Sequence, residues 1–150
     1  AMLQESLKDA SDLGRTIDVV LEAATLDRFR AFMDTQWGRV VHFSGHGQET
    51  YMAWEDDRGL LEKVNSNTLR GLFSGGTSEP ILVFVSACHS EWVGRQLVEQ
   101  NVRHVVCCEL EVALLDTAAN EFTRSFYRSL ACGAPLLLAF KAAQDAVRIA

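Results

Sequence analysis

The segment Ile81-Leu82-Val83-Phe84-Val85 directly follows Pro80 and is apolar at every position. A short apolar run without polar alternation is typical of a strand that is covered on both faces, as in a parallel sheet with helices on each side. Ser86-Ala87-Cys88 comes next, and a helix is expected over residues 91–100. This stretch therefore predicts a central strand of an α/β protein with a cysteine at its carboxyl end.

The rest of the chain alternates strand and helix patterns, which favours a parallel or mostly parallel sheet. Further strands are expected at residues 17–21, 39–43 and 103–108, with a hairpin from residues 51–54 and 59–64. Helices are expected up to about residue 10, after a Thr25 cap, and over residues 65–73, 117–130 and 135–149. The fold class predicted from this order is α/β.

Composition and charge exclude several classes of protein. The length of 150 residues indicates one domain, residues 1–150. A net charge of −6 with no basic run argues against nucleic acid as a partner. No apolar stretch approaches ~20 residues, so no membrane span is expected. The chain begins without a secretory signal, and its 4 cysteines include no CxxC pair, so we expect reduced thiols in a cytoplasmic protein.

Two of the predicted strands end in residues that can carry out chemistry. Ser44-Gly45-His46-Gly47 follows one strand, and Ser86-Ala87-Cys88 follows another. Ligands of open parallel sheets bind beyond the carboxyl ends of the strands, and neighbouring strands lie about 5 Å apart. If these strands are neighbours, Cys88 and His46 can share a cleft as a nucleophile and its base. Taken separately, each residue has a plainer explanation: Cys88 can be a buried thiol, and His46 can be a surface imidazole in a turn.

A zinc site is the main rival chemistry at these strand ends. His42, His46, Cys88 and His89 would be its ligands. The glycines on both sides of His46 should break the strand, and no spaced ligand pair exists, so we expect no metal.

Three acidic residues follow the strand predicted at residues 103–108. Glu109, Glu111 and Asp116 could hold a basic side chain of a substrate. A helix-capping Asp116 and solvated glutamates explain the same residues at least as well. Ser86 is another candidate for substrate binding, although a small residue at a strand end is the simpler interpretation.

Two motifs occur together, His-Phe-Ser-Gly-His-Gly at residues 42–47 and Phe-Val-Ser-Ala-Cys at residues 84–88. With the helical segment at residues 116–127, they resemble the CHAT family of caspase-like peptidases, relatives of caspases, separases and metacaspases. The likeness spans about residues 37–147. It implies a caspase-like three-layer α/β/α sandwich with a mostly parallel sheet.

The resemblance also implies an activity and a set of site residues. The activity is that of a cysteine endopeptidase, with Cys88 as nucleophile, His46 as base, and the backbone N–H groups of Gly47 and Cys88 as the oxyanion hole. Asp116 best matches the acidic position of the family, and no cofactor is needed. The implied partners are a peptide or protein substrate and a regulatory partner or fused sensor module. A homodimer through the sheet edge, as in caspases, is a further analogy.

The sequence departs from the family pattern in two places. Related sequences usually begin with another apolar strand, which is not seen ahead of Leu3, so we expect a fragment that lacks the first strand. Glu109-Leu110-Glu111 stands where the family often has a tryptophan. These departures keep a second hypothesis open, a caspase-like scaffold or protein-interaction module without turnover.

Overall fold

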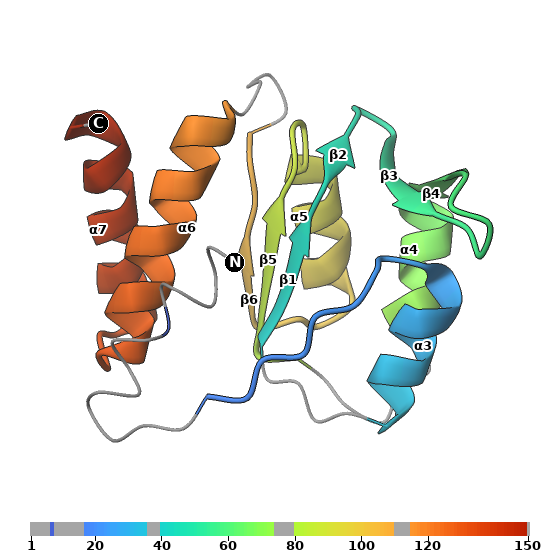
Figure 1. Cartoon of the computed structure of the whole chain (residues 1–150), viewed down its shortest axis with the longest axis horizontal. Coiled ribbons are helices and arrows are strands. Elements are labelled where there is room, and N and C mark those ends of the chain that lie inside the picture. The colour runs from blue at the N-terminus through green and yellow to red at the C-terminus, as the bar shows by residue number, and fades with distance from the viewer. Residues whose placement is uncertain (1–6, 8–16, 36–39, 74–79, 110–114, 150) are drawn as a thin grey trace. The chain divides into compact units, whose positions relative to one another are not determined.

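The computed structural model describes residue 7 and residues 17–35, 40–73, 80–109 and 115–149 (Figure 1). The chain divides into two compact units, one of residues 22–113 and the other of residues 1–21 together with 114–150. Within the described residues, no helix has the length and apolar character needed to cross a membrane. The larger unit contains both chemically unusual strand ends.

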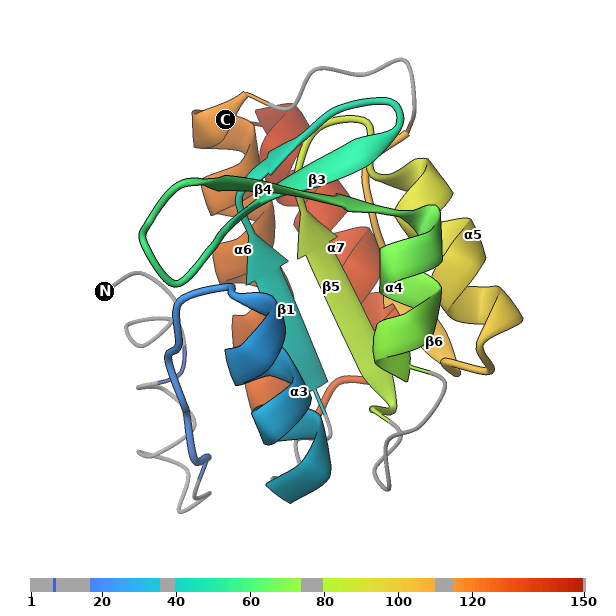
Figure 2. The same cartoon turned by 90° about the vertical axis from the view of Figure 1, so that its right-hand side faces the viewer.

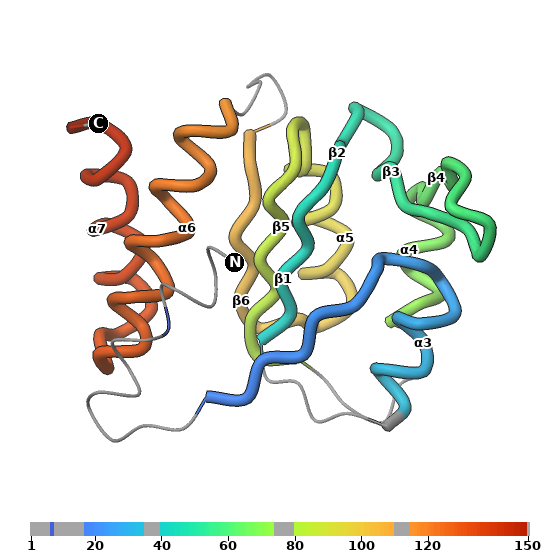
Figure 3. The backbone as a smooth tube through the Cα atoms, in the orientation of Figure 1, coloured from blue at the N-terminus to red at the C-terminus, as the bar shows by residue number. Residues whose placement is uncertain are grey.

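A parallel sheet with the strand order β1-β5-β6 forms the centre of the larger unit. Its strands are β1 (Val40–Ser44), β5 (Leu82–Ser86) and β6 (His104–Val106). β5 lies between the other two, and its first four residues are all buried, as the apolar run predicts. Figure 3 shows β1 and β5 side by side, and their register is parallel. The prediction of a buried central strand in an α/β fold is confirmed.

Three helices cover one face of this sheet, as Figure 2 shows. They are α3 (Leu26–Thr35), α4 (Ser66–Phe73) and α5 (Glu91–Glu99). Their apolar sides and the sheet form one core, which includes Phe29, Met33, Val41, Phe43, Leu69, Leu72, Val83, Val85, Val93 and Leu97. α3 begins after Thr25 as predicted, because the Thr25 hydroxyl accepts a hydrogen bond from the Arg28 N–H at 3.3 Å.

An antiparallel sheet follows β1 in the same unit. It consists of β2 (His46–Gly47), β3 (Tyr51–Glu55) and β4 (Leu61–Asn65), in that order. The turn between β3 and β4 is held by Asp56, whose Oδ1 accepts hydrogen bonds from the N–H groups of Arg58 and Leu60 at 2.8 Å each. Gly59 adopts a φ of 74° there. The predicted hairpin is confirmed.

The β-branched segment at residues 17–21 is not a strand, so that prediction is wrong. Val20 and Leu21 are 57% and 61% exposed, and no described strand pairs with them. Strand propensity depends on packing against neighbours, and this segment lacks such packing. The helix predicted up to residue 10 lies outside the described residues, apart from residue 7.

The described helices of the smaller unit, α6 (Asp116–Ala131) and α7 (Leu136–Ile149), form a helical hairpin. The two helices pack through apolar side chains, with the rings of Phe122 and Phe140 edge to face at 5.4 Å. Gly133 ends α6 with a φ of 91°, and its N–H donates to the Leu130 carbonyl at 2.9 Å. Both predicted helices are present, while the prediction of a single domain stays a prediction.

Candidate active site

The parallel register of β1 and β5 brings the two unusual strand ends together. Ser44 pairs with Ser86, so both strands leave the sheet at the same level. The Gly45 N–H donates to the Ser86 carbonyl at 3.2 Å and extends this link by one residue. His46 and Cys88 each lie two residues beyond the last pair. The two strands are therefore parallel neighbours, which is the condition under which His46 and Cys88 were expected to share a cleft.

Gly47 packs directly on the backbone of the cysteine segment. A Cβ atom at Gly47 would overlap the Cys88 carbonyl oxygen and lie 3.2 Å from the Cβ of Ala87. Backbone atoms of this kind cannot move aside as a flexible side chain can, so only glycine fits at this position. Gly47 is buried, whereas the neighbouring His46 is exposed at the start of β2.

Cys88 lies in a tight turn between β5 and α5, and its side chain is half-buried. The next residue, His89, has a φ of 53°, in the left-handed region that residues with a Cβ rarely adopt. Such conformations persist only where surrounding contacts hold the chain, and they are frequent at functional sites. The turn therefore presents Cys88 on a fixed loop directly before a helix.

A second link between the two segments was not anticipated from the sequence. The Trp92 Nε1 in the first turn of α5 donates a hydrogen bond to the Gln48 carbonyl at 2.9 Å. Gln48 directly follows Gly47, so this bond joins the β2–β3 turn to the helix that follows Cys88. The partners are 44 positions apart, and no local sequence signal predicts such a contact.

The residues after β6 form another part of the surroundings of Cys88. Burial raises the pKa of the Cys108 thiol, and negative charge on Cys88 and on Glu109 raises it further. The Cys108 side chain therefore lies within electrostatic reach of Cys88, a proximity that no sequence pattern indicated. Glu109 is exposed beside it.

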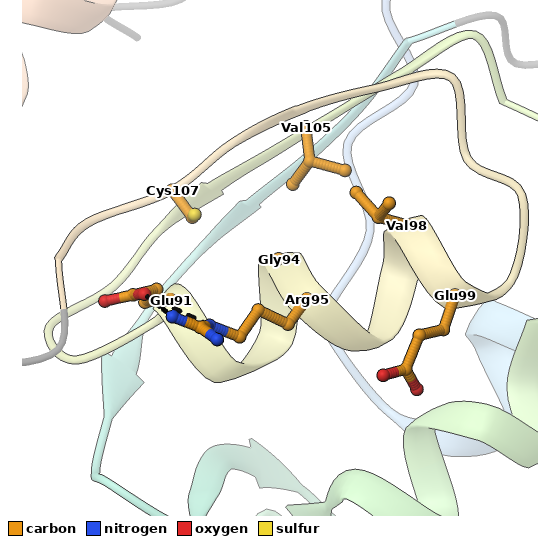
Figure 4. Close-up of a pocket in the computed structure, with 7 residues that line it drawn as sticks. All are labelled: Glu91, Gly94, Arg95, Val98, Glu99, Val105 and Cys107. Carbon is orange, nitrogen blue, oxygen red and sulfur yellow. Dashed lines mark hydrogen bonds and ion pairs between the residues drawn. The ribbon is translucent and has the colours of Figure 1, made fainter.

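Cys107 faces a different environment, shown in Figure 4. It lines an open pocket of about 410 Å³ between α5 and β6, where an Arg95–Glu91 ion pair of 2.6 Å lies at one side. Burial is the main cause that raises the pKa of the Cys107 thiol, followed by the charge on Glu91. Adjacent cysteines thus lie in separate surroundings.

The remaining predicted site residues are placed as follows. Ser86 is the half-buried last residue of β5. Asp116 is exposed in the first turn of α6, in the smaller unit. The N-cap position belongs to Leu115, so the interpretation of Asp116 as a helix cap is wrong. Glu111 lies outside the described residues.

The histidines and cysteines do not assemble into a metal site in the part of the chain that the structure describes. β1 ends at Ser44, so His42 and His46 do not belong to one continuous strand. His42 contacts the Phe84 ring edge to face at 4.6 Å, and burial lowers its pKa to about 4. A neutral imidazole packed on the sheet is a structural feature, separate from the strand ends.

Comparison with protein-family models finds a match to the CHAT domain over residues 2–149. Comparison with curated proteins finds no match. The family match covers nearly the whole chain, including both motifs.

Proposed function

The chain belongs to the CHAT family, which is related to the caspase-like clan CD cysteine peptidases, and we propose that it is a cysteine endopeptidase. The observation that supports this activity best is the Ser44–Ser86 register, because it sends His46 and Cys88 out of the sheet at the same level. The packing of Gly47 on the Cys88 carbonyl supports the same conclusion, since it keeps the two segments in close contact.

In this proposal the Cys88 thiolate attacks the carbonyl carbon of a peptide bond, forming a carbon–sulfur bond. The backbone N–H groups of Gly47 and Cys88 stabilise the oxyanion that develops in the tetrahedral intermediate. His46 donates a proton to the leaving amine as the carbon–nitrogen bond breaks, which leaves an acyl-enzyme on Cys88. Water, deprotonated by the now neutral His46, then attacks the thioester, and the carbon–sulfur bond breaks to release the acid product and restore the Cys88 thiolate beside protonated His46.

Three residues are proposed to bind the substrate. The charge on Cys88 raises the pKa of the Cys108 thiol, and the exposed Glu109 directly follows Cys108. A carboxylate therefore lies on the β6 side of the nucleophile. Such a carboxylate suits an arginine or lysine side chain of the substrate. Asp116 is the second acidic candidate, because it matches the acidic position of the family. Ser86 is the third candidate, because it is the half-buried last residue of β5, two positions before Cys88.

The proposal extends to the setting of the enzyme. We propose that the fold is one caspase-like three-layer sandwich. The packing of α3, α4 and α5 on one face of the sheet supports this. We further propose a cytoplasmic protein that is regulated within a larger protein or complex. A homodimer through the edge of the sheet is part of the same analogy with caspases.

The test is a library of short fluorogenic peptides that vary at the residue before the cleaved bond. Wild-type protein is compared with Cys88→Ala and His46→Ala, and Cys132→Ala serves as the matched control because Cys132 is an exposed free thiol. We expect cleavage by the wild type and the control, with loss in both dyad variants. A preference for arginine or lysine that Glu109→Gln or Asp116→Asn removes would identify the substrate acid.

Cleavage that persists in Cys88→Ala would contradict the proposed mechanism. If no peptide is cleaved, the rate at which iodoacetamide modifies Cys88 is measured next. A Cys88 that reacts no faster than free cysteine would contradict the peptidase and favour the scaffold without turnover.

A further inference from the structure

Ser90 has a hydroxyl group that bridges two strand ends of the parallel sheet. Its Oγ donates to the Val85 carbonyl at 3.4 Å and accepts a hydrogen bond from the Cys108 N–H at 2.9 Å. The residue is only 1% exposed. One buried hydroxyl therefore satisfies a carbonyl at the end of β5 and an N–H beyond the end of β6.

Helix capping does not explain this serine. Ser90 is the N-cap residue of α5, yet its side chain makes no cap hydrogen bond. An N-cap serine ordinarily accepts a hydrogen bond from an N–H of the first helical turn. Here the backbone carbonyl of Ser90 accepts from the Gly94 N–H at 3.1 Å, while the hydroxyl is directed to β5 and to Cys108.

The bond from Ser90 to Val85 closes a short loop that contains Cys88. Residues 86–89 lie between its two ends, and His89 in this loop has a φ of 53°. A residue with a Cβ keeps that conformation only where neighbouring contacts hold it. The Ser90 hydroxyl is such a contact, because it fixes the end of the loop that directly follows His89.

The bond to Cys108 fixes the opposite side of the nucleophile. The Cys108 thiol lies within electrostatic reach of both Cys88 and Glu109. Without the hydroxyl, the Cys108 N–H loses its partner, and the Cys108–Glu109 segment loses its link to the cysteine loop.

We propose that Ser90 is a positioning residue for Cys88, which holds the nucleophile loop between the ends of β5 and β6. The inference rests on the proposed peptidase activity, since it assigns Ser90 a role in that same site. In this role Ser90 acts through the placement of the Cys88 loop, by its hydrogen bonds to Val85 and Cys108.

The test compares wild type, Ser90→Ala and Ser90→Thr, each as the full chain. Val64→Ala is the matched control, since Val64 is fully buried in β4, within the antiparallel sheet, and its truncation weakens the core without removing a bond to the cysteine loop. Turnover of the best fluorogenic peptide gives kcat and KM. Peptide-resolved mass spectrometry gives the rate of Cys88 alkylation as a function of pH, separately from the other three cysteines. Thermal unfolding checks that each variant is folded.

We expect Ser90→Ala to lower kcat roughly 10- to 100-fold, the range for a reacting group displaced by about 1 Å, with a smaller change in KM. The rate of Cys88 alkylation at neutral pH should fall in Ser90→Ala toward that of free cysteine. Ser90→Thr restores the hydroxyl and should recover most of kcat. Val64→Ala should lower the unfolding temperature while leaving kcat and the rate of Cys88 alkylation unchanged.

A folded Ser90→Ala protein with unchanged kcat and an unchanged alkylation profile would overturn the role of Ser90 and leave the peptidase intact. An equal loss of kcat in Val64→Ala would also overturn it, since general destabilisation would then be the cause. A wild-type protein without turnover, whose Cys88 reacts like free cysteine, would instead overturn the proposed function, and the role of Ser90 with it.

Discussion

The segments that follow β5 and β6 both carry cysteine, and in both a glycine from a neighbouring element packs against that segment. After β5 the chain turns sharply at Cys88, and Gly47 packs on the backbone carbonyl of that residue. After β6, Cys107 and Cys108 directly follow the strand, and Gly94 packs on the side-chain sulfur of Cys107. The first contact joins two backbones, and the second joins a backbone and a thiol. A side chain can move aside more easily than a backbone, so the β5 end tolerates a larger residue in place of its glycine less well than the β6 end does.

The largest effect is expected from a methyl group at the β5 end. Gly47→Ala places a Cβ on the Cys88 carbonyl, so the two segments must separate. We expect kcat to fall by roughly 10²–10³-fold, the cost of losing one oxyanion donor in other enzymes. Gly45→Ala is the control, because its Cβ would meet only the Ala53 carbonyl oxygen at 3.8 Å, an ordinary contact. Peptide turnover is measured after circular dichroism has shown that both variants are folded. Full activity in Gly47→Ala would refute the importance of this contact.

The sheet beneath the strand ends should make the protein sensitive to acid. Burial lowers the pKa of His42 to about 4 from 6.5, so between these values the unfolded chain binds a proton that the folded chain does not. The corresponding stability, about 3 kcal/mol, is complete above about pH 6.5 and is lost as the pH falls toward about 4.

Replacing His42 with phenylalanine removes this proton uptake. Urea unfolding at about pH 7 and about pH 4.5 should show a smaller loss of stability on acidification in His42→Phe than in the wild type. Equal losses in the two proteins would show that other groups cause the acid sensitivity. The comparison within each protein cancels any change in packing that the new ring introduces.

The thiols at the two strand ends should differ in reactivity. Burial and the charges on Cys88 and Glu109 raise the pKa of Cys108, so little of it is thiolate at neutral pH. We expect iodoacetamide to modify Cys88 roughly tenfold faster than Cys108 in the folded protein. Cys88→Ala should accelerate modification of Cys108, because a negative neighbour has been removed. A rate of Cys108 modification that Cys88→Ala leaves unchanged would mean that the two side chains are not coupled.

The smallest effect is expected at the β6 end. A Cβ at Gly94 would lie 2.6 Å from the Cys107 sulfur, so we expect Gly94→Ala to destabilise the protein by about 1–2 kcal/mol. Gly71→Ala in α4 meets nothing within 4 Å and should stabilise by about 0.5–1 kcal/mol. Urea unfolding measures both free energies. Adding Cys107→Ala should relieve the strain in Gly94→Ala, and a double variant no more stable than the single one would argue against this contact.

Much of the fold could be predicted from the sequence because burial leaves a periodic pattern. The unbroken apolar run at residues 81–85 marked the central strand, and the order of elements marked its parallel neighbours. Residues 17–21 carry the same β-branched composition but form no strand, because propensity alone does not supply a pairing partner.

The candidate site was predictable only in part. The two motifs at strand ends pointed to His46 and Cys88 from local patterns, and the structure supplies the register that relates them. The contacts of Ser90 with Cys108 and of Trp92 with Gln48 join residues 18 and 44 positions apart. Such contacts depend on how elements pack in space, and single residue types at helix starts do not reveal them.

The pairing of β1 with β5 also has a consequence for the order of folding. Its partners, such as Val40 and Leu82, are 42 positions apart, whereas Tyr51 and Asn65 in the β3–β4 hairpin are only 14 apart. Closing a long loop costs more chain entropy and is slower than forming a hairpin, which takes on the order of 1–10 μs. The segments that carry His46 and Cys88 therefore come together only when this pairing, the most distant one among the described strands of the larger unit, has closed, so a nascent or partly unfolded chain carries the two segments apart.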